Sequence, residues 1–154
     1  MVSSDRTMPA SHALILDDDP IDRETLQETL AGEGWIVDAH SRSGLVKYLK
    51  LLRKPDIVLL DVSDPAVAPQ AAAASLRIHY GPELPILAMS EQPELKWSQR
   101  IDAFDFLRKP IDERRLLERI ARGQSLTERS ARLRAHSDAA LDGMRRLRGQ
   151  DQPD

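Results

Sequence analysis

The segment over residues 56–62 (DIVLLDV) constrains the fold most, because it is the most continuous apolar stretch of the chain. A strand of this composition is buried on both faces, as strands are in the middle of a parallel sheet. The stretch also runs into an aspartate, Asp61. The sequence therefore predicts a central parallel strand that carries a carboxylate to one edge of a sheet.

The first 122 residues repeat a unit of one strand followed by one helix five times. The other strands are predicted at 12–16, 35–39, 85–90 and 104–107. The helices are predicted at 20–32, with Asp19 as N-cap, and at 41–52, 71–79, 93–103 and from 112 onward. This alternation indicates an α/β fold, a doubly wound five-stranded parallel sheet with helices on both faces. In such sheets, function collects beyond the carboxyl ends of the strands.

The chain after Gly123 has a different composition and predicts a further helix at 126–147, outside the five-unit domain. Four small or apolar residues spaced by sevens support it on an arginine-rich background: Leu126, Leu133, Ala140 and Leu147. We therefore predict a domain at residues 10–122 and an amphipathic C-terminal helix at 123–150. Such a helix serves in dimerisation, in partner docking or as a linker, and the sequence leaves these roles open.

The composition limits the chemistry that the chain can perform. It has no cysteine, which excludes disulfides, thiolate catalysis and cysteine zinc sites and agrees with a reducing cytoplasm. No apolar run approaches the roughly 20 residues that span a bilayer. A net charge of -3 gives no field that favours nucleic acid. We therefore expect a cytoplasmic protein that binds neither membranes nor nucleic acid.

Polar side chains with a shared chemistry fall at the ends of four predicted strands. They are Asp17, Asp18, Asp61, Ser90 and Lys109. A parallel sheet brings these ends to one edge, where the carboxylates repel one another and favour a hard cation such as Mg²⁺. One carboxylate can then attack phosphorus and form an aspartyl phosphate. Lys109 and the ion would neutralise the transferring group, and Ser90 would donate a hydrogen bond to it.

Four motifs carry a resemblance to a known family. They are ILDDDP at 15–20, IVLLDVSDP at 57–65, ILAMS at 86–90 and FDFLRKP at 104–110. With these motifs in order, each at a strand end, the chain resembles the receiver domain of response regulators in two-component systems over roughly residues 10–121. The resemblance implies a flavodoxin-like fold with strand order 2-1-3-4-5, followed here by an extra C-terminal helix.

The resemblance also implies roles for the acidic residues. Asp61 is the expected phosphoacceptor, and a sensor histidine kinase or a phosphotransfer protein is the expected donor. Asp18 and Asp61 are expected to bind Mg²⁺ directly, with the Val62 backbone carbonyl or the neighbouring Ser63 as a further ligand. Asp17 is expected to act on the ion through water.

Three further roles follow from the same resemblance. Ser90 and Lys109 are expected to contact the phosphoryl group, and Phe106 takes the place of the switch aromatic. The expected protein is a signalling module that catalyses only its own phosphorylation and dephosphorylation. It would pass its signal to an unknown downstream partner by protein–protein contact. A homodimer through the C-terminal helix, or through the face of the fourth helix, fifth strand and fifth helix, is one open arrangement.

Three alternatives stay open. The chain is the receiver portion of a larger regulator, with the terminal helix as a stalk. Or it is a pseudo-receiver that binds partners without phosphorylation, because Glu91 follows Ser90 and the loop after Pro65 lacks the usual Met-Asp-Gly turn. A metal-dependent phosphohydrolase is more distant, since the position two residues after its nucleophile usually holds an Asp, and here it holds Ser63.

Overall fold

The computed structural model describes residues 11–42, 45, 49, 53–63, 69–92 and 101–150. Its strands are β1 (His12–Leu16), β2 (Ile36–His40), β3 (Ile57–Asp61), β4 (Ile86–Ser90) and β5 (Asp105–Arg108). They form one parallel sheet in the order β2-β1-β3-β4-β5. The predicted fold class is therefore confirmed, and each strand bound lies within one residue of its prediction.

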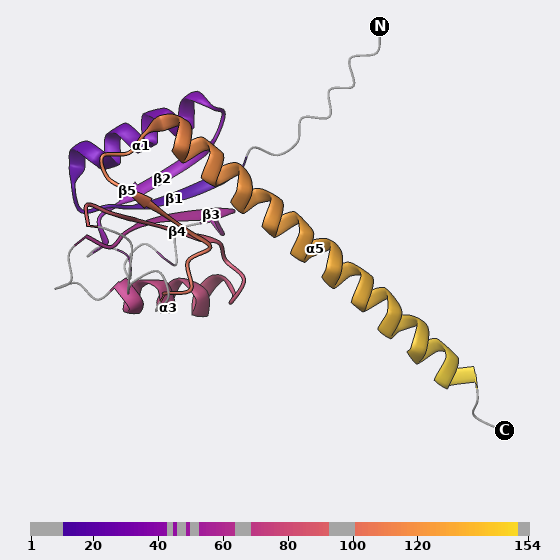
Figure 1. Ribbon diagram of the computed structural model, residues 1–154. Helices are drawn as coiled ribbons and strands as arrows, with labels where there is room; N and C mark the ends of the chain where they lie inside the picture. The colour runs from indigo at the N-terminus through magenta and orange to yellow at the C-terminus, as the bar shows by residue number, and fades with distance from the viewer. Residues whose placement is uncertain are drawn as a thin grey trace, which may run out of the picture.

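Helices cover both faces of the sheet (Figure 1). They are α1 (Pro20–Gly32), α3 (Pro69–Tyr80) and α5 (Glu113–Gln150). The helices predicted at 41–52 and 93–103 fall mostly outside the described residues. The buried side chains described there are Arg42, Leu45, Leu49 and Ile101.

The start and end of α1 follow from local chemistry. The Asp19 carboxylate accepts hydrogen bonds from the backbone N–H groups of Ile21 and Asp22, which confirms Asp19 as the N-cap. Pro20 occupies the first turn, where it has no hydrogen bond to lose. Gly34 lies at φ 87°, a left-handed conformation that favours glycine, and the chain turns there into β2. The turn sets the start of β2 beside β1.

Two apolar layers pack against the sheet because side chains alternate along each strand. Leu14 and Leu60 belong to the layer that contacts Leu76 of α3. Ile15 and Leu59 belong to the layer under α1 and α5. Every residue of β3 is buried, which confirms the predicted central strand. Burial of each large apolar side chain stabilises the fold by roughly 1.5–3 kcal/mol.

The predicted C-terminal helix is present and continues α5. We expected it to begin after Gly123, but α5 runs without a break for 38 residues. Gly123 is buried, and a Cβ atom added there would lie 2.7 Å from the ring of Phe104. The glycine therefore allows a close approach between α5 and the chain before β5, and it does not end the helix.

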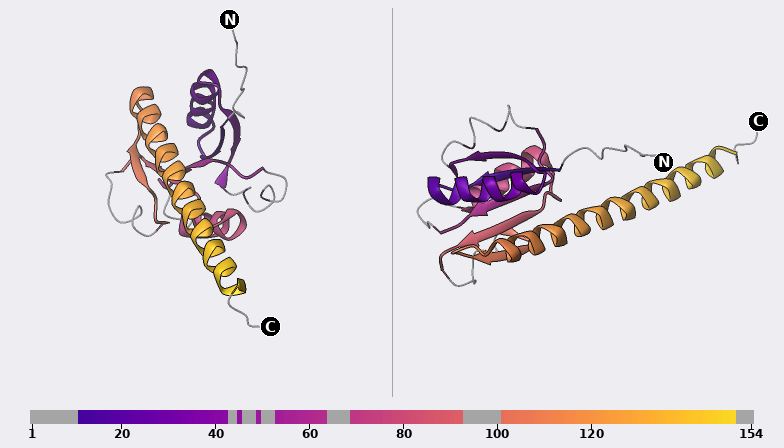
Figure 2. Two further views of the ribbon diagram at one scale, coloured as in Figure 1. Left: turned by 90° about the vertical axis from the view of Figure 1, so that its right-hand side faces the viewer. Right: turned by 90° about the horizontal axis from the view of Figure 1, so that it is seen from above.

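The second half of α5 projects away from the sheet (Figures 1 and 2). Residues 128–149 are all exposed. Where α5 leaves the domain, the Gln124 side chain donates to Ser11 Oγ at 3.2 Å, and Arg134 forms an ion pair with Glu83. None of the described helices is both long and apolar enough to cross a membrane.

Candidate functional site

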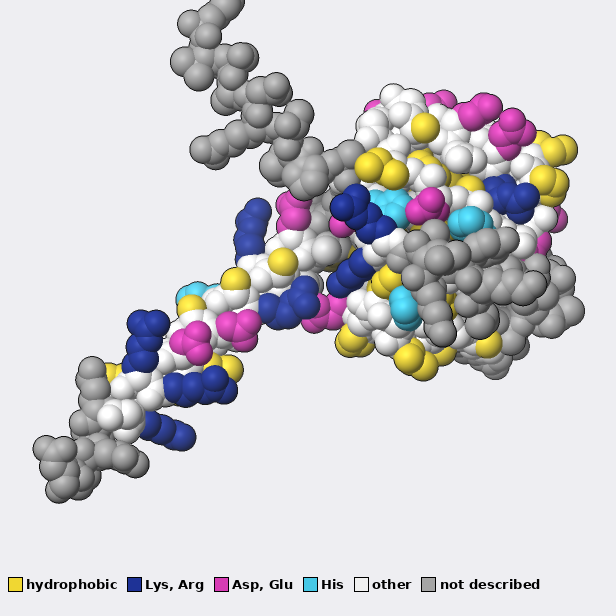
Figure 3. Space-filling view, turned by 180° about the vertical axis from the view of Figure 1, so that it is seen from behind, with side chains coloured by type: hydrophobic (Ala, Val, Ile, Leu, Met, Phe, Trp, Pro, Cys, Tyr) yellow, Lys and Arg dark blue, Asp and Glu magenta, His cyan; other side chains and the backbone are white. Residues whose placement is uncertain are grey.

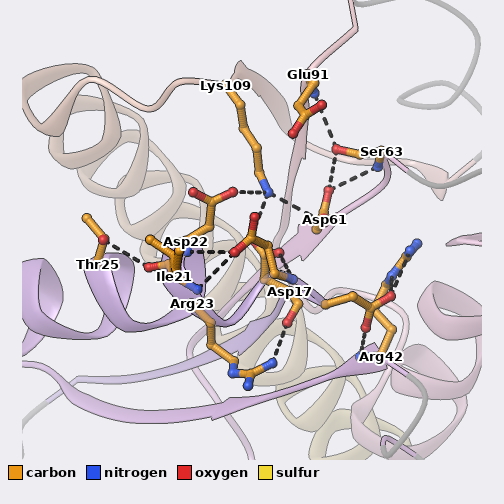
Figure 4. Close-up of polar contacts among 12 residues, drawn as sticks. Asp17, Ile21, Asp22, Arg23, Thr25, Arg42, Asp61, Ser63, Glu91 and Lys109 are labelled. Carbon is orange, nitrogen blue, oxygen red and sulfur yellow. Dashed lines mark hydrogen bonds and ion pairs between the residues drawn. The ribbon is translucent and has the colours of Figure 1, made fainter.

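Lys109 lies among carboxylates at the carboxyl edge of the sheet (Figure 4). Its Nζ donates to Asp17 Oδ2 at 2.8 Å and to Asp22 Oδ2 at 2.9 Å, and lies 3.4 Å from Asp61 Oδ2. Asp17, Asp61 and Lys109 are buried. Residues that follow β1 and β5 thus meet the last residue of β3, as expected for the ends of parallel strands.

The carboxylate of Asp61 is held on its other side by Ser63. Asp61 Oδ1 accepts from the Ser63 backbone N–H at 3.0 Å and from Ser63 Oγ at 2.6 Å. Burial alone would raise the pKa of Asp61, but these hydrogen bonds and the Lys109 charge hold that pKa below its ordinary value. Asp61 is therefore ionised at neutral pH and available as a nucleophile.

For the pKa of Asp17, the effect of burial outweighs that of the hydrogen bonds. Its complete burial raises its pKa to about 6, against the hydrogen bonds from Lys109 and from the Asp19 backbone. For Lys109, burial would lower the pKa, but hydrogen bonds to Asp17 and Asp22 hold it above the ordinary value. Three carboxylates thus surround one ammonium group, and this excess of negative charge favours a further cation.

The Asp18 carboxylate contacts Arg42, which follows β2. Asp18 Oδ1 accepts from the Arg42 backbone N–H at 2.8 Å. Asp18 Oδ2 accepts from Arg42 Nε at 3.1 Å and lies 3.0 Å from Arg42 Nη2. Within the described residues, no group of three or more histidine or acidic side chains is arranged to hold a metal ion. The resemblance predicted Asp18 beside Asp61 on one ion, whereas here its carboxylate is taken by Arg42.

The other predicted residues are Ser90, Val62 and Phe106. Ser90 is buried; its Oγ accepts from the backbone N–H of Gln92 at 3.1 Å, and its carbonyl accepts from the Lys109 N–H at 2.7 Å. Val62 is buried, and its N–H donates to the Met89 carbonyl at 2.8 Å. Phe106 is half-buried.

The surroundings of Phe106 and Glu91 add to this picture. Phe106 packs against the apolar layer that contains Leu14 and Leu60. Glu91 is exposed, and its backbone N–H donates to Ser63 Oγ at 3.3 Å. A hydrogen-bonded link therefore runs from the loop after β4 through Ser63 to the Asp61 carboxylate.

Two residues of this network, Asp22 and Arg42, were not predicted as site residues. The sequence marks Asp22 as a favourable acid in the first turn of α1, and that role hides its contact with Lys109. Arg42 follows β2, so the rule that strand ends meet at one edge applies to it as well. That rule was the signal that could have found Arg42.

This fold and site define a receiver-type α/β domain: a doubly wound parallel sheet with an aspartate at the end of its central strand beside a lysine that follows its last strand. The sequence model of the response regulator receiver domain matches residues 13–121, which is more than half of the chain. The chain belongs to this family and contains the receiver domain of a two-component response regulator.

Curated relatives agree with this assignment. An uncharacterised response regulatory protein of Vibrio cholerae is 33% identical over 112 residues. The transcriptional regulatory protein BtsR of Escherichia coli is 32% identical over 111 residues. Each alignment covers 71% of this chain but only 47% and 46% of the relatives. The chain thus spans about half the length of the curated relatives that it matches.

Solved structures show the same fold. A response regulator from Thermotoga maritima has a TM-score of 0.65 at 19% identity, over 75% of this chain and 98% of that chain. NtrX from Brucella abortus has a TM-score of 0.72 at 22% identity, over 80% of this chain and 29% of that chain. At such identities the likeness shows the fold alone.

Proposed function

We propose that Asp61 accepts a phosphoryl group from a sensor histidine kinase or a phosphotransfer protein. The observation that carries this proposal is the buried Asp61, whose Oδ2 lies 3.4 Å from Lys109 Nζ. An Asp61 oxygen attacks phosphorus, the bond from phosphorus to the donor's histidine nitrogen breaks, and that nitrogen keeps the electron pair. Lys109 is placed to neutralise charge on the transferring group.

In this proposal, Mg²⁺ is the cofactor that the carboxylates around Lys109 would bind. The side chains around Lys109 offer only carboxylate oxygens, and their charge exceeds that of the lysine. Asp61, the Val62 carbonyl and Asp17 through water would hold the ion, and Asp18 would join them once it is released from Arg42. Bound Mg²⁺ would supply charge neutralisation at the phosphoryl oxygens.

The output passes, in this proposal, by protein–protein contact through the exposed face of α5. Figure 3 shows hydrophobic side chains along the projecting helix with arginines beside them. The large exposed ones are Leu126, Leu133, Leu141, Met144 and Leu147. The receiver domain would occupy residues 10–122, and residues 123–150 would dock a partner or link to the rest of a larger regulator, as the length of the relatives supports.

A homodimer is the competing arrangement, either through α5 or through the face that includes β5. A heptad with Leu126 and Leu133 at d places Arg129 at g and Arg134 at e. A parallel pair of copies would then set these arginines side by side. The charge pattern therefore favours a partner helix with acidic flanks over a second copy.

The test is incubation of the full chain with acetyl phosphate and Mg²⁺, followed by intact-protein mass spectrometry. We expect a gain of one phosphoryl group in the wild type and in Asp138→Asn, whose side chain is exposed on α5. We expect no gain in Asp61→Asn. A gain that persists in Asp61→Asn would contradict the assignment of the phosphoacceptor.

A pseudo-receiver is the second candidate, and the Arg42 contact with Asp18 is the observation that favours it. An arginine that permanently takes a metal ligand would leave a binding module with the fold and without phosphorylation. Absence of any mass gain in the wild type, with acetyl phosphate or with a phosphorylated histidine donor, would select this candidate.

A further inference from the structure

Arg42 makes three contacts with one carboxylate, a geometry more specific than that of an ordinary surface ion pair. Its backbone N–H, Nε and Nη2 all lie within 3.1 Å of an Asp18 oxygen. The Arg42 side chain is 1% exposed and that of Asp18 is 37% exposed. A hydrogen bond between a guanidinium and a carboxylate is charge-assisted, and it is stronger than a bond between two neutral groups.

We propose that Arg42 is a resident cation that competes with Mg²⁺ for Asp18 and sets the Mg²⁺ concentration that the receiver requires. The proposal rests on the proposed function, because it assumes that Asp18 is a metal ligand. It assigns Arg42 a role in metal affinity and none in contact with the phosphoryl group.

The competition follows from charge and burial. Asp18 is already neutralised by Arg42, so an incoming ion must displace the guanidinium or bind without this carboxylate. Displacement breaks the contacts of the buried guanidinium with Asp18, and the loss of such contacts is costly. The apparent Mg²⁺ affinity is then the intrinsic affinity multiplied by the fraction of molecules in which Asp18 is released.

The two cations of the site divide the carboxylates between them. Lys109 contacts Asp17, Asp22 and Asp61 (Figure 4). Arg42 contacts Asp18. The acids near Lys109 still carry an excess of negative charge, whereas Asp18 does not. Removal of the Arg42 charge should therefore raise Mg²⁺ affinity through Asp18.

The test is calorimetric titration of the full, unphosphorylated chain with Mg²⁺. We expect Arg42→Gln to bind Mg²⁺ about tenfold more tightly than the wild type. Arg42→Lys keeps a charge but loses the planar fork, so we expect an intermediate Kd. In an Asp18→Asn background, Arg42→Gln should leave the Kd unchanged, because the carboxylate over which the cations compete is gone.

A matched control is Arg119→Gln. Arg119 pairs with Asp105 at 3.1 Å, away from the Lys109 cluster, and its loss should not change the Kd. Circular dichroism checks that each variant is folded. If Arg42→Gln does not fold, Arg42→Lys still provides the test. An unchanged Kd in the folded Arg42 variants overturns this inference, as does tightening that persists with Asp18→Asn.

The outcomes separate this inference from the proposed function. If the wild type binds Mg²⁺ and gains a phosphoryl group while the Arg42 variants keep its Kd, the inference fails and the function stands. If Mg²⁺ binds to no variant and Asp61 gains no phosphoryl group, both are overturned.

Discussion

Asp17 and Asp61 share Lys109 but differ in what burial does to them. Asp61 receives two hydrogen bonds from Ser63, which keep its pKa low. The side chain of Asp17 is fully enclosed, and burial raises its pKa to about 6. The site therefore holds one carboxylate that ionises readily and one whose charge opposes folding in the absence of a metal ion.

This difference predicts a pH dependence of stability in the metal-free protein. Between the ordinary pKa of 3.8 and about 6, folded Asp17 keeps a proton that the unfolded chain has lost. Stability from this group is therefore greatest at low pH and falls as pH rises through that window, by about 3 kcal/mol at roughly 1.4 kcal/mol per pKa unit.

The measurement is urea denaturation with a chelator from pH 4 to pH 7. Asp17→Asn lacks the titrating group, so its stability relative to the wild type should rise across the window. The lowered pKa of Asp61 does not cancel this effect, because it changes the pH dependence of stability only below about pH 3.8. A constant difference between wild type and Asp17→Asn would show that Asp17 does not titrate as the geometry implies.

Sequence reasoning found the members of the site better than their pairing. The strand ends brought Asp17, Asp61 and Lys109 to one place, because a parallel sheet leaves little freedom there. The sequence does not show which of two adjacent aspartates turns toward Lys109 and which toward Arg42. That choice depends on side-chain directions at the start of α1 and on an arginine 24 residues further along the chain.

At the scale of the element, α5 depends on one glycine. Gly123 lies inside the helix and touches the Phe104 ring, although glycine normally weakens a helix interior. The composition change at this point suggested a boundary between two helices. Contact with Phe104 explains the glycine instead, and such a contact between distant residues leaves no periodic signal in the sequence.

Gly123→Ala should therefore destabilise the protein by about 1–3 kcal/mol, because its Cβ would overlap the Phe104 ring. Gly143→Ala is the matched control in the same helix, where no atom lies within 4 Å of the added Cβ. It should stabilise the helix by about 0.5–1 kcal/mol. Urea denaturation measures both, and equal gains in the two variants would contradict the close approach.

The strands were predictable to within one residue because their apolar runs are short and bounded by prolines, glycines or aspartates. The start of α5 was also predicted to within one residue, but its continuity past Gly123 was not. Residues 128–149 are all exposed, so burial does not show where the domain stops, and the arginine-rich pattern fits a separate helix equally well.

At the scale of the molecule, the chain consists of a packed sheet domain and a projecting helix. Beyond Thr127, the projecting helix contacts the sheet domain through the ion pair of Arg134 with Glu83. Both of these side chains are largely exposed. Exposed pairs contribute about 0–1 kcal/mol. The sheet domain should therefore be stable without the projecting part.

Truncation after Thr127 should change the free energy of unfolding by less than about 1 kcal/mol. Truncation after Asp112 is the control: it removes Leu116 and Ile120 from the core, and loss of each such side chain typically costs about 2–5 kcal/mol. Denaturation of the two truncated chains compares them. A large loss on truncation after Thr127 would show that the projecting helix supports the fold.

Because α5 is unbroken, it acts mechanically as a lever. It begins at Glu113, soon after Lys109 in the chain, and its 38 residues make a rod about 57 Å long at about 1.5 Å per residue. A tilt of one degree about its first turn carries the far tip about 1 Å. A tilt of a few degrees, which displaces atoms near Lys109 only slightly, would therefore move the distal end of α5 by several ångströms.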